Sequence, residues 1–174
     1  MKYKGLFTQY INDLAQKTPT PGGGSAGSLI FCIGVSLIQM AVNFSITRKN
    51  KKRLKRAIFI FDKEKEKIFS YIDLDGEIFN KVIKSKGSLR KKFVKDLENI
   101  TFELGKSCIK ILLKANKIEF LIKTNILSDF YIGCKCIKVA LFASVKNMEA
   151  NEGFFFLKSR RKINYLKKYL NKIR

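Results

Sequence analysis

Both prolines of this 174-residue chain, Pro19 and Pro21, lie in one short loop, and residues 22–174 contain none. Long stretches without proline leave room for long helices, because proline breaks helices. Apolar residues recur at helical spacing along these stretches, and no strand-like alternation of apolar and polar residues persists. The sequence therefore predicts an all-α fold, a single-domain helical bundle of about five to six helices that occupies residues 1–174.

The apolar spacing places these helices over about residues 6–14, 25–46, 54–82, 88–111, 127–148 and 163–170. Ser25 and Ser88 stand where the N-caps of the second and fourth helices are expected. Gly76 is expected to loosen the long third helix locally, and a break is expected near residues 114–123.

The chain carries 36 Lys and Arg against 14 Asp and Glu, a formal net charge of +22. Such an excess favours polyanionic partners, which include nucleic acid, an anionic membrane surface or a multiply charged small molecule. The alternative is compositional drift in an AT-rich genome, with the lysines simply solvated. Charge balance alone does not separate the two.

The chain contains no histidine, which excludes histidine bases, histidine metal ligands and Ser-His-Asp triads. The four cysteines form no CxxC motif, so no metal site is expected. Free thiols fit a reducing compartment, and no signal peptide is evident, so a cytoplasmic protein is expected.

Residues 22–47 carry no charge, and a basic cluster follows over residues 48–53. This arrangement is also that of a transmembrane helix with a positive flank. However, several serines and the polar residues Gln39 and Asn43 interrupt the apolar run, and a single span would leave the other amphipathic segments without a partner. The favoured interpretation is a buried central helix and no membrane span.

Two features point to chemistry. The apolar stripe of the third helix, continued from Ile72, reaches Asp75, a carboxylate on an apolar face. Partial burial there would raise its proton affinity and suit it to acid–base work, whereas a bend near Gly76 would leave it on the surface. The second feature is the run Gly22-Gly23-Gly24 before Ser25, where backbone N–H groups at a helix start favour an anion. A tight capped turn is the simpler alternative.

Four segments, in order, carry a resemblance to a known family. The loop 18–25 (TPTPGGGS) is similar to an (S/T)P(T/A)PGGGS loop, and residues 73–79 (DLDGEIF) to a D-x-D-A-x-A-F segment. Residues 125–129 (NILSD) are similar to N-x-x-S-D, and Asn147 and Asn151 to the asparagines of N-V-x-I-N. The chain thereby resembles the formiminotransferase-cyclodeaminase and methenyltetrahydrofolate cyclohydrolase family over about residues 6–155.

The resemblance implies an enzyme acting on the carbon between N5 and N10 of tetrahydrofolate, either a methenyltetrahydrofolate cyclohydrolase or a formiminotetrahydrofolate cyclodeaminase. It implies catalysis by Asp75, with Asp73 as the next candidate. The expected substrate-binding residues are Pro21, Gly22, Gly23, Gly24, Ser25, Asn125, Ser128, Asp129, Asn147 and Asn151. No metal is implied.

The resemblance also implies a tetrahydrofolate derivative as the ligand, with or without several glutamates, and no cofactor beyond this substrate. It implies a homodimer, with the uncharged helix at or near the interface. Two alternatives remain at this level: a catalytically degenerate folate-binding protein, and a basic helical protein that binds nucleic acid. The absence of any nucleic-acid-binding motif disfavours the second.

Overall fold

A computed structural model of the chain describes residues 3–152 and 159–172. These residues form seven α-helices and two short 3₁₀ turns and contain no β-strand, which confirms the all-α prediction. The elements are α1 (Tyr3–Leu14), α2 (Gly23–Phe44), α3 (Lys51–Phe69), α4 (Tyr71–Lys84), α5 (Gly87–Asn116), η1 (Glu119–Leu121), η2 (Thr124–Ile126), α6 (Leu127–Asn151) and α7 (Arg160–Lys172).

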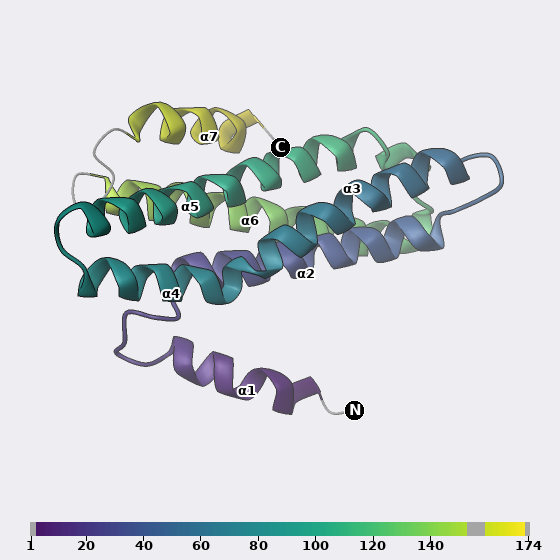
Figure 1. The fold of residues 1–174 in the computed structure, drawn as a ribbon. Coiled ribbons are helices and arrows are strands. Elements are labelled where there is room, and N and C mark those ends of the chain that lie inside the picture. The colour runs from purple at the N-terminus through teal and green to yellow at the C-terminus, as the bar shows by residue number, and fades with distance from the viewer. Residues whose placement is uncertain (1–2, 153–158, 173–174) are drawn as a thin grey trace.

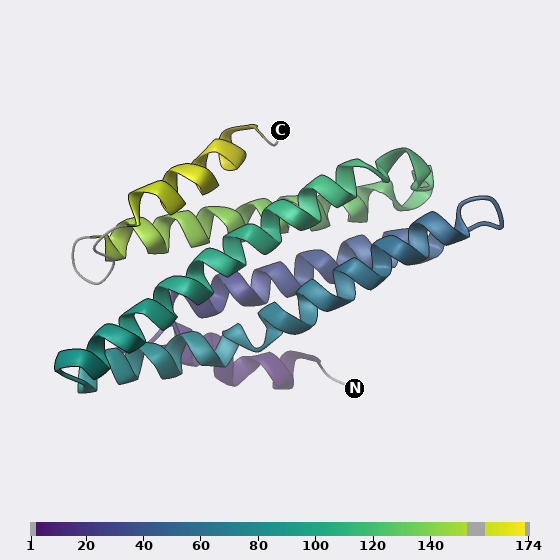
Figure 2. The same ribbon diagram turned by 45° about the horizontal axis from the view of Figure 1, so that its top comes forward.

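The uncharged segment forms α2, the central helix of the bundle, and it contacts α3, α4, α5 and α6. Figures 1 and 2 show α3 and α4 following one another along one side of α2, with α5 and α6 completing the bundle and α7 lying over them. Among the described residues, α2 is the one helix long and apolar enough to cross a membrane, but most of its apolar stretch is buried inside the bundle. It is therefore accounted for as a core helix.

Glycine permits the closest contact in the bundle, between α2 and α6. A Cβ atom on Gly34 would lie 2.8 Å from the carbonyl oxygen of Gly133, and one on Gly133 would lie 2.7 Å from that of Gly34. Any side chain at either position would force the helices apart, because real Cβ atoms do not approach so closely. This contact fixes the position of α6 against α2 along their antiparallel course.

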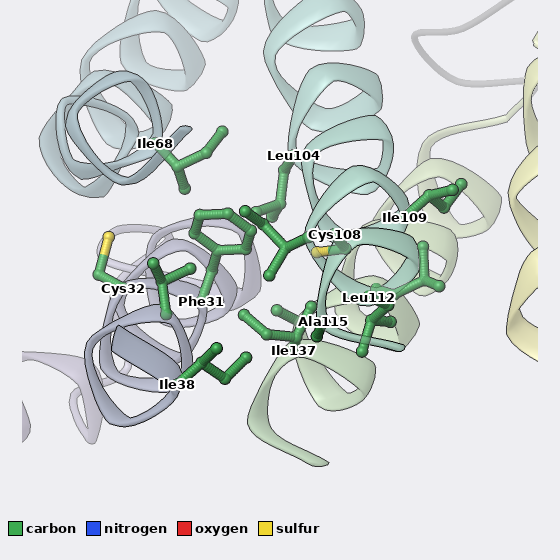
Figure 3. Close-up of a cluster of buried hydrophobic side chains, with 14 of the residues drawn as sticks. Phe31, Cys32, Ile38, Ile68, Leu104, Cys108, Ile109, Leu112, Ala115 and Ile137 are labelled. Carbon is green, nitrogen blue, oxygen red and sulfur yellow. The ribbon is translucent and has the colours of Figure 1, made fainter. Parts of the chain in front are cut away.

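The core lies between α2, α3, α5 and α6. Figure 3 shows Phe31 of α2 pointing between Ile68 of α3 and Leu104 and Cys108 of α5, and all four side chains are buried. At roughly 25 cal/mol per Å² of apolar surface, burial of such side chains contributes about 2 kcal/mol each. The predicted apolar stripes supply these residues, which explains why the fold class was predictable.

The prediction of one continuous third helix is wrong. The chain divides at Ser70 into α3 and α4, and the division adds one helix to the expected number. The Ser70 hydroxyl donates a hydrogen bond to the carbonyl oxygen of Lys67 at 2.8 Å, a local bond that competes with the helical ladder. Gly76 does not loosen the segment, since α4 continues through it to Lys84.

The predicted N-caps are also wrong. The helix α2 begins at Gly23 with Gly22 as its N-cap, and Ser25 lies in its first turn. The Ser25 hydroxyl instead hydrogen-bonds to the Tyr10 hydroxyl, with 2.9 Å between the oxygens. The helix α5 begins at Gly87, whose φ of +58° favours glycine, so it starts before Ser88.

The first helix forms as predicted but buries none of its residues. Figure 1 shows α1 apart from the bundle, joined to it by the loop that precedes α2. Its apolar residues remain open, with Leu6 62% exposed and Ile11 60% exposed. Apart from Tyr10, whose hydroxyl bonds to that of Ser25, the face predicted to be apolar therefore remains open within the described part of one chain.

Candidate functional site

The proline and glycine loop packs on α4, and this contact builds the site. A Cβ atom on Gly76 would lie 3.2 Å from the Cβ atom of Thr20, and the Asn80 amide donates a 3.5 Å hydrogen bond to the Thr20 hydroxyl. The peptide bond between Thr20 and Pro21 is cis. With glycine at position 76, the loop lies directly on the helix that carries Asp75.

Asp75 lies directly under the start of α2. A Cβ atom on Gly24 would overlap both carboxylate oxygens of Asp75, so only glycine leaves room for the carboxylate. Burial raises the pKa of the Asp75 carboxyl, and a hydrogen bond donated by the Ser25 backbone N–H partly offsets that rise. The net effect is a carboxyl group that holds its proton more tightly than an exposed aspartate.

Asn147 faces the same loop from α6. A Cβ atom on Gly23 would lie 2.8 Å from the Oδ1 atom of Asn147. The Nδ2 atom of Asn147 is buried and has no hydrogen-bond partner within the described residues. A buried amide donor without a partner costs free energy. Its presence therefore marks a place where an oxygen atom of a ligand or of water would accept a hydrogen bond.

Asn151, one turn further along α6, does not join Asn147 in the site. Its side-chain amide donates a 2.8 Å hydrogen bond to the backbone carbonyl of Asn147. The prediction that both asparagines address one ligand therefore has support at Asn147 alone. Asn151 instead closes the last turn of α6.

A small cavity lies against Asp75 and Gly24. Its volume is about 10 Å³, close to the space that one water molecule needs. Polar side chains reach it from three helices: Ser28 of α2, Tyr71 of α4 and Thr101 of α5. Asp75 thus borders a water-sized cavity that also reaches Gly24 of the glycine loop and is otherwise lined by Ile100 and Leu104.

The structure brings together the residues of the loop (Pro21, Gly22, Gly23, Gly24 and Ser25) with Asp75 and Asn147. Asp73 is exposed, on a different face of α4 from Asp75.

Asn125, Ser128 and Asp129 lie elsewhere, at η2 and the first turn of α6. Because 18 residues of α6 separate Asp129 from Asn147, the two lie roughly 27 Å apart at 1.5 Å per residue. Within one chain, these three residues are therefore not part of the site around Asp75.

Sequence reasoning missed Tyr71, Ser28, Thr20 and Asn80. Tyr71 precedes Asp75 by one helical turn and Ser28 follows Gly24 by one turn, so both were findable by helical spacing from residues already singled out. Burial raises the pKa of the Tyr71 hydroxyl, with Lys67 acting in the opposite direction. Thr20 and Asn80 meet only through the loop's conformation, which no spacing rule supplies.

No group of three or more metal-ligating side chains occurs within residues 3–152 and 159–172. All four cysteines are free thiols. Burial raises the pKa of the Cys32 thiol to about 11, with Lys65 acting in the opposite direction. Such a thiol is a poor nucleophile at neutral pH.

Comparison with known proteins agrees with the fold. The chain has the fold of a formiminotetrahydrofolate cyclodeaminase from Thermotoga maritima, with a TM-score of 0.77 and 18% sequence identity over 95% of this chain and 93% of that one. No curated protein matches the chain by sequence. The sequence profile of the formiminotransferase-cyclodeaminase family, however, matches residues 7–171. The chain therefore belongs to the formiminotransferase-cyclodeaminase family.

Proposed function

We propose that this protein is a folate one-carbon enzyme that acts on the carbon between N5 and N10 of tetrahydrofolate. The observation that carries the proposal is the placement of Asp75, a partly desolvated carboxyl group beneath a glycine loop and beside a water-sized cavity. Raised proton affinity brings a carboxyl group closer to the pH at which it can both accept and return a proton.

In the cyclohydrolase reaction, water attacks the methenyl carbon, a cationic amidine carbon bonded to both nitrogens. Asp75 takes one proton from the water as the new C–O bond forms. It then returns that proton to one of the two nitrogens as the C–N bond to it breaks. The hydroxyl proton of the intermediate leaves to solvent, and a formyl group remains on the other nitrogen. The water-sized cavity beside Asp75, which the hydroxyl groups of Ser28, Tyr71 and Thr101 border, is the proposed place for the attacking water.

In the cyclodeaminase reaction, N10 attacks the protonated formimino carbon on N5, and Asp75 takes the proton of N10. The tetrahedral carbon then carries N5, N10 and an amino group. Asp75 gives its proton to this amino group, ammonia leaves, and the methenyl cation remains. Both reactions place the same demand on Asp75, so its geometry is compatible with either.

The free Nδ2 donor of Asn147 and the start of α2 are proposed to bind the ligand. The donor would meet a carbonyl oxygen of the folate, and the backbone N–H groups of the loop would meet an acceptor or an anion. The excess of lysine would attract the glutamate tail, whether one residue or several. The proposed reactions use only water and proton transfer, so we propose no further cofactor. We also propose a cytoplasmic location.

We also propose a homodimer. An apolar groove of about 700 Å³ runs along the outer face of α2 beside α3 and includes Leu29, Ile33, Leu37, Met40 and Phe69. The spacing of Ile33, Leu37 and Met40 is that of a helix-pairing seam. The exposed apolar face of α1 offers a second surface of the same kind.

An antiparallel pairing of two α2 helices would place the end that carries Asn125, Ser128 and Asp129 near the partner's glycine loop. Within one chain, η2 lies near the end of α2 opposite the glycine loop, since the backbone N–H of Lys123 donates a 2.9 Å hydrogen bond to the Ser45 hydroxyl. The dimer would thereby bring together two sets of predicted binding residues that lie far apart within one chain.

The direct test is to incubate the purified protein with methenyltetrahydrofolate and, separately, with formiminotetrahydrofolate. Loss of methenyl absorbance faster than in buffer would identify a cyclohydrolase. Appearance of the same absorbance with release of ammonia would identify a cyclodeaminase. If neither substrate reacts faster than in buffer, the enzyme proposal is wrong, and a binding role alone would be left.

A further inference from the structure

The contact between α3 and α5 carries charged side chains along its length, and in its middle each lysine pairs with a carboxylate. Glu64 of α3 is only 6% exposed. It accepts hydrogen bonds from Ser107 at 2.7 Å and from Lys110 at 2.5 Å. It also pairs with Lys67 at 3.0 Å. Lys67 and Lys106 in turn pair with Glu103. The bundle thus supplies carboxylates wherever lysines gather in this part of the contact.

At the end of the same contact the pattern changes. Arg53 and Arg56 lie at the start of α3, Lys114 lies in the last turn of α5, and Lys117 follows that helix directly. The two members of each pair are three residues apart in the sequence. We call these four residues the cation cluster. None of them forms an ion pair with a carboxylate in the described parts of the chain. Four cations in one place without a counter-charge repel one another and destabilise the fold.

The repulsion is visible at Lys114. Its burial lowers the pKa of its ammonium group, and the charges of Arg56, Lys117 and Arg53 lower it further. Lys114 therefore lies within electrostatic reach of the other three cations. An anion placed among them would relieve this repulsion.

One cation of the cluster is held in place before any ligand arrives. The guanidinium of Arg53 donates a 2.5 Å hydrogen bond to the backbone carbonyl of Lys117, and it lies 4.8 Å from the centre of the Phe120 ring. These contacts join α3 to the segment that follows α5. A fixed cation loses less conformational entropy on binding than a free one. Phe120 itself is 71% exposed, so much of its ring remains open.

The cation cluster is remote from the folate site. Gly24 contacts Asp75 at the start of α2, whereas α3 begins just after the other end of α2. The 20 residues from Gly24 to Phe44 span roughly 30 Å at 1.5 Å per residue. Figure 1 shows the start of α3 and the end of α5 at the opposite end of the bundle from α4.

We propose that the cation cluster is a second binding site, for a compact phosphate polyanion whose two or three consecutive phosphates bridge α3 and α5. Packed helices lie about 8–10 Å apart and residues three apart on a helix lie about 5–6 Å apart, so the four charged groups fall within roughly 10 Å. A short phosphate chain concentrates several negative charges over that distance, and arginine forms paired hydrogen bonds to phosphate. The phosphates can come from an inorganic polyphosphate or from a nucleotide that carries them.

The test is calorimetric titration of the whole protein with inorganic tripolyphosphate at low salt. The variant Arg56→Gln/Lys114→Gln/Lys117→Gln removes three charges but keeps Arg53 and its contacts. The matched control, Lys91→Gln/Lys92→Gln/Lys95→Gln, removes three exposed charges from the other end of α5. We expect the wild type and the control to bind at least about tenfold more tightly than the cluster variant. Equal affinity in all three proteins would overturn the proposal.

Two further arms identify the source of the phosphates. A nucleoside triphosphate that binds more tightly than tripolyphosphate, with the gain lost in Phe120→Ala, would support a nucleotide whose base stacks on the ring. Equal affinity of the two ligands would support an inorganic polyphosphate. If single-stranded RNA binds the cluster but tripolyphosphate does not compete with it, the compact site is wrong and the surface is one for nucleic acid.

Discussion

At the scale of single residues, the defining feature is a carboxyl group placed where its charge is unfavourable. Burial raises the pKa of Asp75, so the folded protein holds that proton more tightly than the unfolded chain. The free energy of unfolding therefore falls as pH rises from the ordinary aspartate pKa, about 3.9, through the raised value, and the full cost remains above it. The ionised form of Asp75 therefore lowers the free energy of unfolding at neutral pH.

This linkage predicts that Asp75→Asn unfolds at a higher temperature than the wild type at pH 7, because asparagine cannot ionise. The difference should shrink as the pH falls below the raised pKa and vanish below the ordinary aspartate pKa, about 3.9, where Asp75 is protonated in both the folded and the unfolded chain. Thermal unfolding followed by circular dichroism across this range measures it. The exposed Asp73→Asn serves as the control and should change little. A lower melting temperature for Asp75→Asn at pH 7 would contradict the assignment.

The close approach of Gly24 to Asp75 makes a second prediction. The methyl group of Gly24→Ala would overlap the carboxylate, so Asp75 must turn away, and turnover should fall by about tenfold to a hundredfold. Gly5→Ala in α1 is the matched control, since nothing lies within 4 Å of its added Cβ atom. The measurement is turnover per folded molecule. Unchanged turnover in Gly24→Ala would mean that the contact does not position Asp75.

Some of the side-chain positions in the site were predicted correctly from the sequence and others were not, and the difference has physical reasons. Asp75 was found because it interrupts an apolar stripe, and the glycines because such a run permits close approach. The partial burial expected of Asp75 is present, whereas Asn151 turned to its own helix. Side-chain direction at a helix end depends on local hydrogen bonds, and sequence spacing does not specify them.

At the scale of elements, α3 and α5 are joined by a buried ionic contact as well as by apolar packing. Burial alone would raise the pKa of the Glu64 carboxyl, but hydrogen bonds from Lys110, Ser107 and Lys67 lower it to about 2. A depressed pKa means that the charged form is stabilised by folding. This contribution is fully present above the ordinary glutamate pKa, about 4.3, and is lost as pH falls toward 2.

Glu64→Gln should therefore lower the free energy of unfolding by about 2 kcal/mol at pH 7, because the lysines lose their counter-charge. The loss should diminish as the pH is lowered from about 4 toward 2, where the wild-type carboxylate is also protonated. Urea unfolding at a series of pH values measures both effects. Glu66→Gln, an exposed neighbour on the same helix, should be nearly neutral. Equal losses in the two variants would remove the special role of Glu64.

Helix positions were well predicted where an apolar stripe is unbroken, as in α5 and α6. The division at Ser70 was missed because the stripe continues through it: Ile68 of α3 and Ile78 of α4 are both buried in the same core. Apolar periodicity reports which face is buried, and it does not report a local hydrogen bond that separates two helices. The helix starts at Gly23 and Gly87 were missed because the prediction relied on serine, which is the more common N-cap.

At the scale of the whole molecule, one end of the bundle holds the candidate folate site and the other holds the cation cluster. The family assignment supports the folate site at the first end. It does not account for the four cations at the second end, which contribute to the net charge of +22. Exposed apolar side chains include Ile33 on the outer face of α2 and Leu6 and Ile11 on α1. A second copy of the chain is the partner proposed for it.

The dimer predicts a mass of about 40 kDa in light scattering at micromolar concentration, twice the 20.0 kDa of one chain. Ile33→Glu places a charge in the α2 groove and should give monomers, because an unpaired charge is costly in an apolar interface. Leu113→Glu is the matched control: Leu113 is 44% exposed and Ile33 is 45% exposed, but Leu113 lies on α5. A monomeric wild type would contradict the dimer.

The central claim is that Asp75 moves the proton in a reaction at the folate one-carbon centre. The most direct measurement compares the turnover of Asp75→Asn with that of the wild type on methenyltetrahydrofolate and formiminotetrahydrofolate, with folding confirmed by the melting temperature. The variant keeps the size of the side chain and removes its charge, so turnover should fall by about a hundredfold or more while the protein remains folded. Near-normal turnover in a folded Asp75→Asn would contradict the account.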